Sequence, residues 1–231
     1  MILRLTRYVV STLVRSSLVL EVGCGTGNVL RILRKACPNS AVVGMELWFE
    51  GLKHAKLRSD AALVQADVRS LPFGKPVDLV GIFDVLEHIP DDRGILTALF
   101  EGLAPGGCVV LTVPAHPSLW SYFDEAAHHC RRYSATELRG KLADAGFQVE
   151  FLSQFMASIF PLVWFVRKVR NLRPHAAAEV AKNQASDEFR IIPLLNQVLF
   201  CLLSMEAIWV GNRWRLPFGT SLVAIARKPN P

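Results

Sequence analysis

Cysteine is scarce in this chain of 231 residues, and its positions follow no pattern. The five cysteines are Cys24, Cys37, Cys108, Cys130 and Cys201. An odd and scattered set argues against a disulfide scaffold and favours a reducing compartment. Charged residues are also few, at 20% of the chain against 51% hydrophobic residues, and this balance excludes a disordered protein.

Long uninterrupted hydrophobic runs are missing as well. Two apolar stretches, 151–166 and 191–205, hold 16 and 15 residues and are broken by proline and polar side chains. A helix that spans a bilayer needs about 20 apolar residues, so both stretches are too short. Arg4, Arg7 and Arg15 interrupt the first segment, which lacks the apolar core of a secretory signal. We therefore expect a cytoplasmic protein.

Acidic residues become rare in the last third of the chain. Residues 1–150 hold 16 basic and 16 acidic side chains, whereas residues 151–231 hold 10 and 4, so the net charge of +6 lies there. Basic and apolar character together favour a surface that faces anionic lipid over a nucleic-acid groove. The alternative is a helical layer with a solvated basic rim. We expect no nucleic-acid partner, and peripheral contact with the inner face of the membrane through residues 156–217.

Short apolar segments alternate with segments of helical periodicity over the first 155 residues. Strands are expected at 18–22, 41–45, 62–66, 77–83, 108–113 and 147–155. Helices are expected at 28–36, 49–58, 91–103 and 135–145, with a turn at 104–107. Apolar strands alternating with helices predict a doubly wound, mostly parallel sheet with helices on both faces.

The alternation stops at residue 156, and one more strand is predicted at 221–226. The expected fold class is therefore α/β, with a seven-stranded sheet in a single domain over residues 1–231. Residues 156–217 form a helical insertion before the last strand. The ligand of such a sheet binds at the carboxyl ends of its strands.

A glycine-rich loop follows the first predicted strand. Gly23, Gly25 and Gly27 are spaced Gly-x-Gly-x-Gly, and Glu21 stands two residues before the first glycine. A dinucleotide fingerprint would need glycine at position 28, where this chain has Asn28. An acidic residue beside the loop suits a ligand that carries an ammonium group better than a pyrophosphate.

Carboxylates also end the next three predicted strands, at Glu46, Asp67 and Asp84. Glu46 follows Gly27 by 19 residues, where a carboxylate can bind both ribose hydroxyls. Because these strands are parallel, their acidic ends lie at one edge of the sheet. A glycine loop combined with acidic strand ends is a far more specific signal than the loop alone.

On these residues the chain resembles the class I S-adenosylmethionine-dependent methyltransferases, over residues 15–155 and again in the last strand. The resemblance implies a Rossmann-like methyltransferase fold and S-adenosyl-L-methionine as cofactor. It further implies that the last strand enters antiparallel beside 147–155. The cofactor-binding residues that it implies are Glu21, Gly23, Cys24, Gly25, Gly27, Asn28, Glu46, Leu47, Asp67, Val68, Phe83 and Asp84.

The same resemblance assigns roles to these positions. The glycine loop cradles the methionine part of the cofactor, Glu46 holds the ribose hydroxyls, and Asp67 with Val68 meets the adenine. A nicotinamide-dependent reductase is the rival enzyme class, and similar short-chain reductases need a tyrosine followed four residues later by lysine. None of the three tyrosines here meets that condition.

His88 is the candidate catalytic residue, because methyl transfer to a hydroxyl requires a base and imidazole titrates near neutral pH. The alternative is a residue that lines the cofactor without moving a proton. The group of Asp84, Glu87 and His88 also resembles a segment that takes part in divalent-metal binding in some quinone-pathway O-methyltransferases. We expect no metal site, since His116, His128, His129 and Cys130 match no usual zinc spacing.

A second cluster of aromatic and charged residues follows the fifth strand and resembles a segment of a subgroup of bacterial methyltransferases. The substrate-binding residues expected from it are Trp120, Tyr122, His129, Arg131, Arg132 and Tyr133. Two adjacent arginines can bind a phosphate or carboxylate. The alternative is a loop that is held in place by ion pairs between Asp124 and the arginines.

The insertion carries one narrow polar stripe, Arg190, Gln197 and Ser204, on an otherwise apolar helix. Such a helix is buried, or lies in lipid or against a hydrophobic substrate. A lipid-linked acceptor would use it, whereas a helical cap on the sheet or a homodimer interface is the competing interpretation. Only 22 residues precede Gly23, so we expect the N-terminal lid of similar enzymes to be mostly absent.

The function expected from the sequence is methyl transfer to a small or lipid-like acceptor, at oxygen. The alternative is a non-catalytic cofactor-binding or membrane-associated partner protein. Acceptor contacts come from variable loops, so the acceptor itself is not encoded in a recognisable motif.

Overall fold

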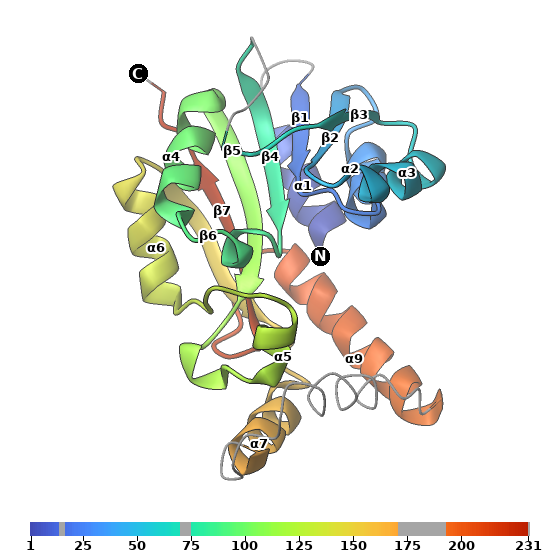
Figure 1. Ribbon diagram of the computed structural model, residues 1–231, viewed down its shortest axis with the longest axis vertical. Helices are drawn as coiled ribbons and strands as arrows, with labels where there is room; N and C mark the ends of the chain where they lie inside the picture. Colours follow the sequence, from blue (N-terminus) through green and yellow to red (C-terminus); the bar gives the residue numbers. More distant parts are fainter. Residues whose placement is uncertain (14–16, 70–74, 171–192, 231) are drawn as a thin grey trace.

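The computed structural model describes residues 1–13, 17–69, 75–170 and 193–230. Its centre is a seven-stranded sheet with the order β3-β2-β1-β4-β5-β7-β6 (Figure 1). The strands are β1 Leu18–Val22, β2 Ala41–Glu46, β3 Ala62–Gln65, β4 Val77–Phe83, β5 Leu103–Pro114, β6 Gln148–Phe155 and β7 Ser221–Arg227. The α-helices are α1 Ile2–Ser11, α2 Asn28–Ala36, α3 Phe49–Arg58, α4 Asp92–Gly102, α5 Tyr122–Ala126, α6 Ala135–Asp144, α7 Phe160–Arg170 and α9 Pro193–Gly211.

The predicted fold class is confirmed. Strands β3, β2, β1, β4 and β5 pair in parallel, whereas β7 pairs antiparallel with both β5 and β6. The last strand thus enters the sheet beside 147–155, as expected. All parallel strands end at one edge of the sheet, and the first four of them in spatial order carry the acidic positions of the sequence pattern.

Two hydrophobic clusters, one on each face, hold the sheet between its helices. One face packs on α4 and α6, where Leu96 and Leu142 are fully buried. The other packs on α1 and α2, where Leu5 and Leu30 are fully buried. Neighbouring residues of β1 point to opposite faces, since side chains of a strand alternate. Burial on both faces explains why the central strands are apolar throughout.

Helix α1 was not expected from the sequence. Leu5 and Val9 lie four residues apart on one side of it and are completely buried against α2 and the sheet. A helix of 10 residues without a side-chain cap is marginal by itself, so tertiary packing stabilises it. The turn expected at 104–107 also differs, because β5 already begins at Leu103 and pairs with β4 across an irregularity in their register.

The insertion does not cover the sheet as a cap. Helices α7 and α9 lie beyond the carboxyl edge of the parallel strands, and α9 points away from the sheet (Figure 1). The C-terminal end of α9 meets the domain, where Arg4 Nη1 donates to Asn212 Oδ1 over 2.9 Å. Arg190 of the predicted polar stripe lies outside the described residues. Within the part of the chain that is described, no helix has the length and apolarity to cross a membrane.

Gly27 closes the glycine loop at the start of α2, with φ of +83°. A Cβ atom there would lie 2.7 Å from the Ala55 Cα of α3. We expect Gly27→Ala to lower the free energy of unfolding by about 3 kcal/mol, from left-handed strain and overlap with backbone. Gly140→Ala is the matched control, because a Cβ atom at that position on α6 would meet no described atom within 4 Å outside its own turn of helix. Urea denaturation measures both, and an equal effect of the two substitutions would contradict this account.

Candidate functional site

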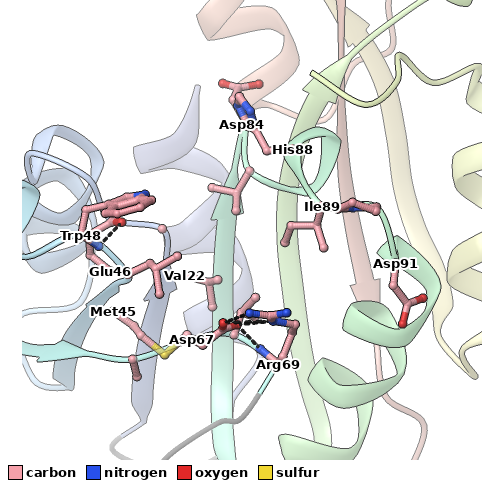
Figure 2. A pocket seen from close by; sticks show the side chains of 16 residues that line it. Val22, Met45, Glu46, Trp48, Asp67, Arg69, Asp84, His88, Ile89 and Asp91 are labelled. Carbon is pink, nitrogen blue, oxygen red and sulfur yellow. Dashed lines mark hydrogen bonds and ion pairs between the residues drawn. The ribbon is translucent and has the colours of Figure 1, made fainter. Parts of the chain in front are cut away.

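A cavity of about 760 Å³ opens at the carboxyl ends of β1, β2, β3 and β4 (Figure 2). The predicted site residues that line it are Gly23, Glu46, Leu47, Asp67, Val68, Asp84 and His88. The lining also includes Val22, Met45, Trp48, Ala66, Arg69, Val85, Ile89, Pro90 and Asp91, which are not among the predicted site residues. Three predicted acidic residues, each following a separate strand, therefore share one cavity with His88, which follows β4 as Asp84 does.

Glu46 ends β2 and connects the cavity to the glycine loop. Its carboxylate accepts the backbone N–H of Gly25 at 2.8 Å and that of Trp48 at 3.0 Å. The side chains of Glu46 and Trp48 lie together on one side of the cavity (Figure 2). Bonds to two backbone amides fix the carboxylate in place, and its remaining lone pairs can accept the hydroxyls of a ribose.

Gly23 brings the backbone of the loop close to the cavity. Its φ is +67°, and a Cβ atom there would lie 2.4 Å from Val85 Cγ2. Any other residue would therefore fill space that the loop shares with the end of β4. The preceding strand, the loop and α2 form the strand–loop–helix unit that the sequence predicted.

Glu21 is buried at the end of β1 rather than exposed in the cavity. It is 3% exposed, and its Oε2 atom has no hydrogen-bond partner among the described residues. Burial and the nearby charge of Glu46 raise the pKa of the Glu21 carboxyl to about 8. An unpaired carboxyl oxygen beneath a glycine loop suits a ligand with an ammonium group, so the residues present fit the cofactor that the fold implies.

The raised pKa of Glu21 predicts a pH dependence of stability. Below a pH of about 8 the native carboxyl keeps a proton that the unfolded chain has already lost above its usual value of 4.5. Stability therefore falls as the pH rises between these values, by up to about 1.4 kcal/mol per pH unit for one such group. Glu87 contributes in the same direction, because burial and Asp84 raise its pKa to about 8.

We expect Glu21→Gln to make the decrease in stability between pH 5 and pH 8 shallower, because the amide does not titrate. Chemical denaturation at several pH values measures the slope. Glu50→Gln is the control, since Glu50 is exposed and its ion pair with Lys53 lowers its pKa. A slope that Glu21→Gln leaves unchanged would show that Glu21 is ionised in the native protein.

Asp67 lies in the cavity, but its carboxylate is already engaged. The backbone N–H and Nε of Arg69 donate to it at 2.9 and 3.0 Å, and Nη2 forms a further short contact (Figure 2). These bonds hold the pKa of Asp67 at about 2. A carboxylate has about four lone-pair sites, so an adenine amino group can still donate to it. Arg69 was not predicted as a site residue, although it follows Asp67 by only two residues and could therefore reach its carboxylate.

The other predicted cofactor residues support the cavity without lining it. Gly27 caps α2, and Asn28 begins that helix. The sulfur of Cys24 is buried, and burial raises its pKa to about 12. Phe83 packs on the opposite face of the sheet, where its ring lies over Gly81. Asp84, which follows β4 with φ of +52°, lines the cavity instead.

The predicted substrate cluster is largely engaged in contacts within the protein. Arg132 is 6% exposed, and its Nη1 lies 2.6 Å from the fully buried carboxylate of Asp124. Tyr133 is completely buried, and its hydroxyl donates to Asp92 at 2.8 Å. The contacts match the alternative of a loop held by ion pairs with Asp124. Burial leaves Arg132 and Tyr133 no open side toward a substrate.

Arg131 and His129 lie nearer the cavity. Arg131 pairs with Asp92 at 2.8 Å and donates to the carbonyl of cavity-lining Pro90 at 2.6 Å. His129 Nδ1 lies 3.0 Å from Asp124 Oδ1. Trp120 and Tyr122 are half-buried around α5 and do not belong to the cavity lining.

His88, His129 and Glu87 come together beside the cavity. The His88 and His129 rings meet edge to face, with centroids 4.8 Å apart. Among the described residues, these two and Glu87 form a group whose ligand atoms lie within 4.8 Å of one another, so they could hold a divalent cation. Glu87 Oε2 is buried, with no partner in the described part of the chain. No metal site was expected from the sequence, and His116, which was weighed as a ligand, instead bonds Gln154 at 2.7 Å.

A family model described as a methyltransferase domain matches residues 2–151. The chain belongs to this methyltransferase family. The solved structure of an S-adenosylmethionine-dependent methyltransferase from Mesorhizobium loti has a TM-score of 0.57 and 16% identity, and covers 95% of each chain. One from Clostridium acetobutylicum has a TM-score of 0.59 and 11% identity, over 98% of this chain and 92% of the other. The predicted family, its fold and its cofactor, S-adenosylmethionine, are confirmed.

Curated relatives of this methyltransferase are similar over part of their length. A trans-aconitate 2-methyltransferase from Azoarcus is 30% identical over 128 residues, which are 55% of this chain and 48% of the relative. A ubiquinone biosynthesis O-methyltransferase from Psychrobacter arcticus is 29% identical over 151 residues, which are 56% and 58%. The chain spans about half the length of the curated relatives that it matches.

Proposed function

We propose that this methyltransferase transfers the methyl group of S-adenosylmethionine to an oxygen of a small or lipid-like acceptor. One observation carries the proposal. A single cavity at the carboxyl edge of the sheet is lined by four residues that the sequence predicted for cofactor binding or for catalysis, namely Glu46, Asp67, Asp84 and His88. This edge is where ligands of open α/β sheets bind.

The cofactor supplies a methyl group on a sulfonium, which is an activated leaving group. The protein then has to bind, orient and exclude water, because an in-line displacement depends mainly on alignment. Glu46 would accept the ribose hydroxyls, and Asp67 would accept the adenine amino group. The buried carboxyl of Glu21 and the glycine loop would face the amino-acid end.

His88 is the residue that would take a proton from a hydroxyl acceptor. It lines the cavity, and partial desolvation together with His129 lowers its pKa below the usual 6.5. The imidazole is thus neutral at physiological pH and able to accept a proton. His129 packs edge-on against His88 and is itself fixed by Asp124, so it orients the ring of His88.

The lipid-like class of acceptor is supported by the apolar surface around the site. Exposed aromatic and aliphatic side chains follow α7 and α9, beyond the same edge of the sheet as the cavity (Figure 1). One relative is named as a ubiquinone biosynthesis O-methyltransferase, which supports oxygen as the methylated atom. Such an acceptor would be met at the inner face of the membrane.

Methyl-tritiated S-adenosylmethionine, offered with a total lipid extract, tests the proposal. We expect a labelled lipid product, and a loss of initial rate of roughly 100-fold or more in His88→Gln, the usual range for removal of a general base. Binding of S-adenosylhomocysteine should remain unchanged in that variant. His54→Gln is the control, because His54 is exposed on α3 away from the cavity lining.

The alternative function, a non-catalytic cofactor-binding partner, gives a different outcome. It predicts S-adenosylhomocysteine binding without any labelled product from lipid or small-molecule extracts. If His88→Gln turns over at the full rate, the methyltransferase function stands, but His88 is not its base.

A further inference from the structure

A second groove lies at the C-terminal end of α9. Its volume is about 660 Å³, and it shares no lining residue with the first cavity. The residues that line it are Glu150, Phe151, Trp209, Asn212, Arg213, Trp214 and Arg215. Tryptophan and arginine side by side form the combination found where a protein meets the headgroup layer of a membrane.

We propose that this groove and the exposed side of α9 form a docking surface for an anionic lipid bilayer. The docking surface consists of Arg4, Arg7, Phe200, Met205, Ile208, Trp209, Arg213, Trp214 and Arg215. The docking surface rests on the proposed function. A protein bound to the bilayer would present its cavity to a lipid-like acceptor.

Within the described part of the chain, no arginine of the docking surface forms an ion pair with a carboxylate. Arg213 lies over the ring of Tyr8, 3.7 Å from its centroid, and Arg4 donates to Asn212 at 2.9 Å. Arg7 and Arg215 are exposed. The acidic residue that lines the groove, Glu150, is already paired with Arg227. Positive charge is therefore concentrated here and available to lipid phosphates.

The apolar part of the docking surface is the exposed side of α9. Phe200 is 71% exposed, Met205 60% and Ile208 48%. Glu206 is the only acidic or basic residue in the sequence of this helix, and its carboxylate accepts the backbone N–H groups of Ala157 at 2.8 Å and Ser158 at 2.6 Å. Its charge is thus satisfied inside the protein. A helix that is apolar on nearly every side requires an apolar environment.

Tryptophans mark the boundary between the apolar and the basic part. The rings of Trp209 and Trp214 meet edge to face with centroids 4.3 Å apart, and both are about half exposed. Indole rings concentrate at the headgroup level of membranes. Phe200 and Met205 would lie in the acyl region, with Arg213 and Arg215 at the phosphates.

Charge favours a bilayer over a second copy of the chain. A two-fold dimer buries the same patch of both copies in one interface, so it brings the arginines of both copies together without an opposite charge. An anionic bilayer presents the opposite charge. The position of α9 also agrees with binding to a bilayer, because α9 leaves the domain at the edge of the sheet on which the cofactor cavity opens (Figure 1).

Vesicle flotation of the full chain tests the docking surface. We expect binding to vesicles of phosphatidylcholine with one-third phosphatidylglycerol, weakened by high salt, and much weaker binding to phosphatidylcholine alone. Arg213→Gln with Arg215→Gln should weaken binding about 30-fold, as removal of two interfacial cations predicts. Lys56→Gln with Arg139→Gln is the matched control, since both residues are exposed on other helices.

A second pair of variants tests the apolar contribution. Phe200→Ser with Met205→Ser should weaken vesicle binding at least roughly tenfold, because two apolar side chains no longer enter the bilayer. Leu57→Ser is the control, since Leu57 is 84% exposed on α3. Thermal unfolding of each variant verifies that the domain remains folded.

Three results would overturn the proposal. They are no binding to the anionic vesicles, equal binding to both kinds of vesicle, and a dimer by light scattering that Phe200→Ser with Met205→Ser dissociates. The proposed function fails separately. Binding to the vesicles without binding of S-adenosylhomocysteine would support the docking surface and contradict the proposed function. Binding of S-adenosylhomocysteine without binding to the vesicles would contradict the docking surface alone.

Discussion

Glu46→Gln is expected to weaken the binding of S-adenosylhomocysteine by about 100-fold, because charge-assisted hydrogen bonds to two ribose hydroxyls are replaced by weaker ones. The amide has the same shape as the carboxylate, and its one oxygen can still accept the Gly25 N–H, which Glu46 accepts at 2.8 Å, but it cannot also accept the Trp48 N–H at 3.0 Å. The loop should therefore stay in place. Isothermal titration calorimetry measures the affinity directly.

Two comparisons make this result specific to the ribose contact. Glu50→Gln removes one negative charge from the exposed start of α3 and should leave the affinity unchanged. NAD should not bind to either protein, since the loop lacks the third glycine of a dinucleotide fingerprint. An affinity that Glu46→Gln leaves intact would mean that the ribose lies elsewhere in the cavity.

Asp124→Asn is expected to lower the free energy of unfolding by about 3 to 5 kcal/mol, because it leaves a buried guanidinium without its counter-charge. Asp124 is completely buried, and Arg132 beside it is 6% exposed. The same carboxylate also accepts the backbone N–H of Ser121 at 3.0 Å and holds His129 at 3.0 Å. Urea denaturation with the linear extrapolation measures the loss.

Asp144→Asn is the matched control for a surface ion pair. Asp144 and Arg93 lie 2.5 Å apart, but their side chains are 59% and 61% exposed. Solvent screens such a pair, so the expected loss is about 0 to 1 kcal/mol. If both substitutions cost the same, the Asp124 carboxylate is not the centre that holds the loop between β5 and α6.

Asp124→Asn should also slow methyl transfer more than it weakens S-adenosylhomocysteine binding. His129 would lose the partner that fixes its ring, and His88 packs against that ring. The cofactor contacts of Glu46 and Asp67 lie on other strands and would persist. A parallel loss of affinity and rate would instead indicate that the whole domain is disturbed.

The sheet, the flanking helices α2, α3, α4 and α6, and the acidic edge follow from the sequence alone. These features depend on local patterns: short apolar strands, a glycine loop, and carboxylates directly after strands. Because the ends of parallel strands meet at one edge, Glu46, Asp67 and Asp84 could be placed in one site before the structure was known. The antiparallel entry of the last strand followed from the family resemblance.

Packing between distant segments accounts for the rest. Arg132 and Tyr133 looked suited to a substrate, and only their burial against Asp124 and Asp92 showed that they hold the loop. Helix α1 was not predicted, because its stability comes from Leu5 and Val9 packing on distant segments.

The docking surface likewise combines α1 with the end of α9, and these segments lie about 200 residues apart in the sequence, as in the bond between Arg4 and Asn212. Local periodicity reports which side of a segment is apolar, but not what covers it. Whether the apolar α9 is buried in the domain or left exposed depends on packing between remote parts of the chain. The structure leaves it exposed.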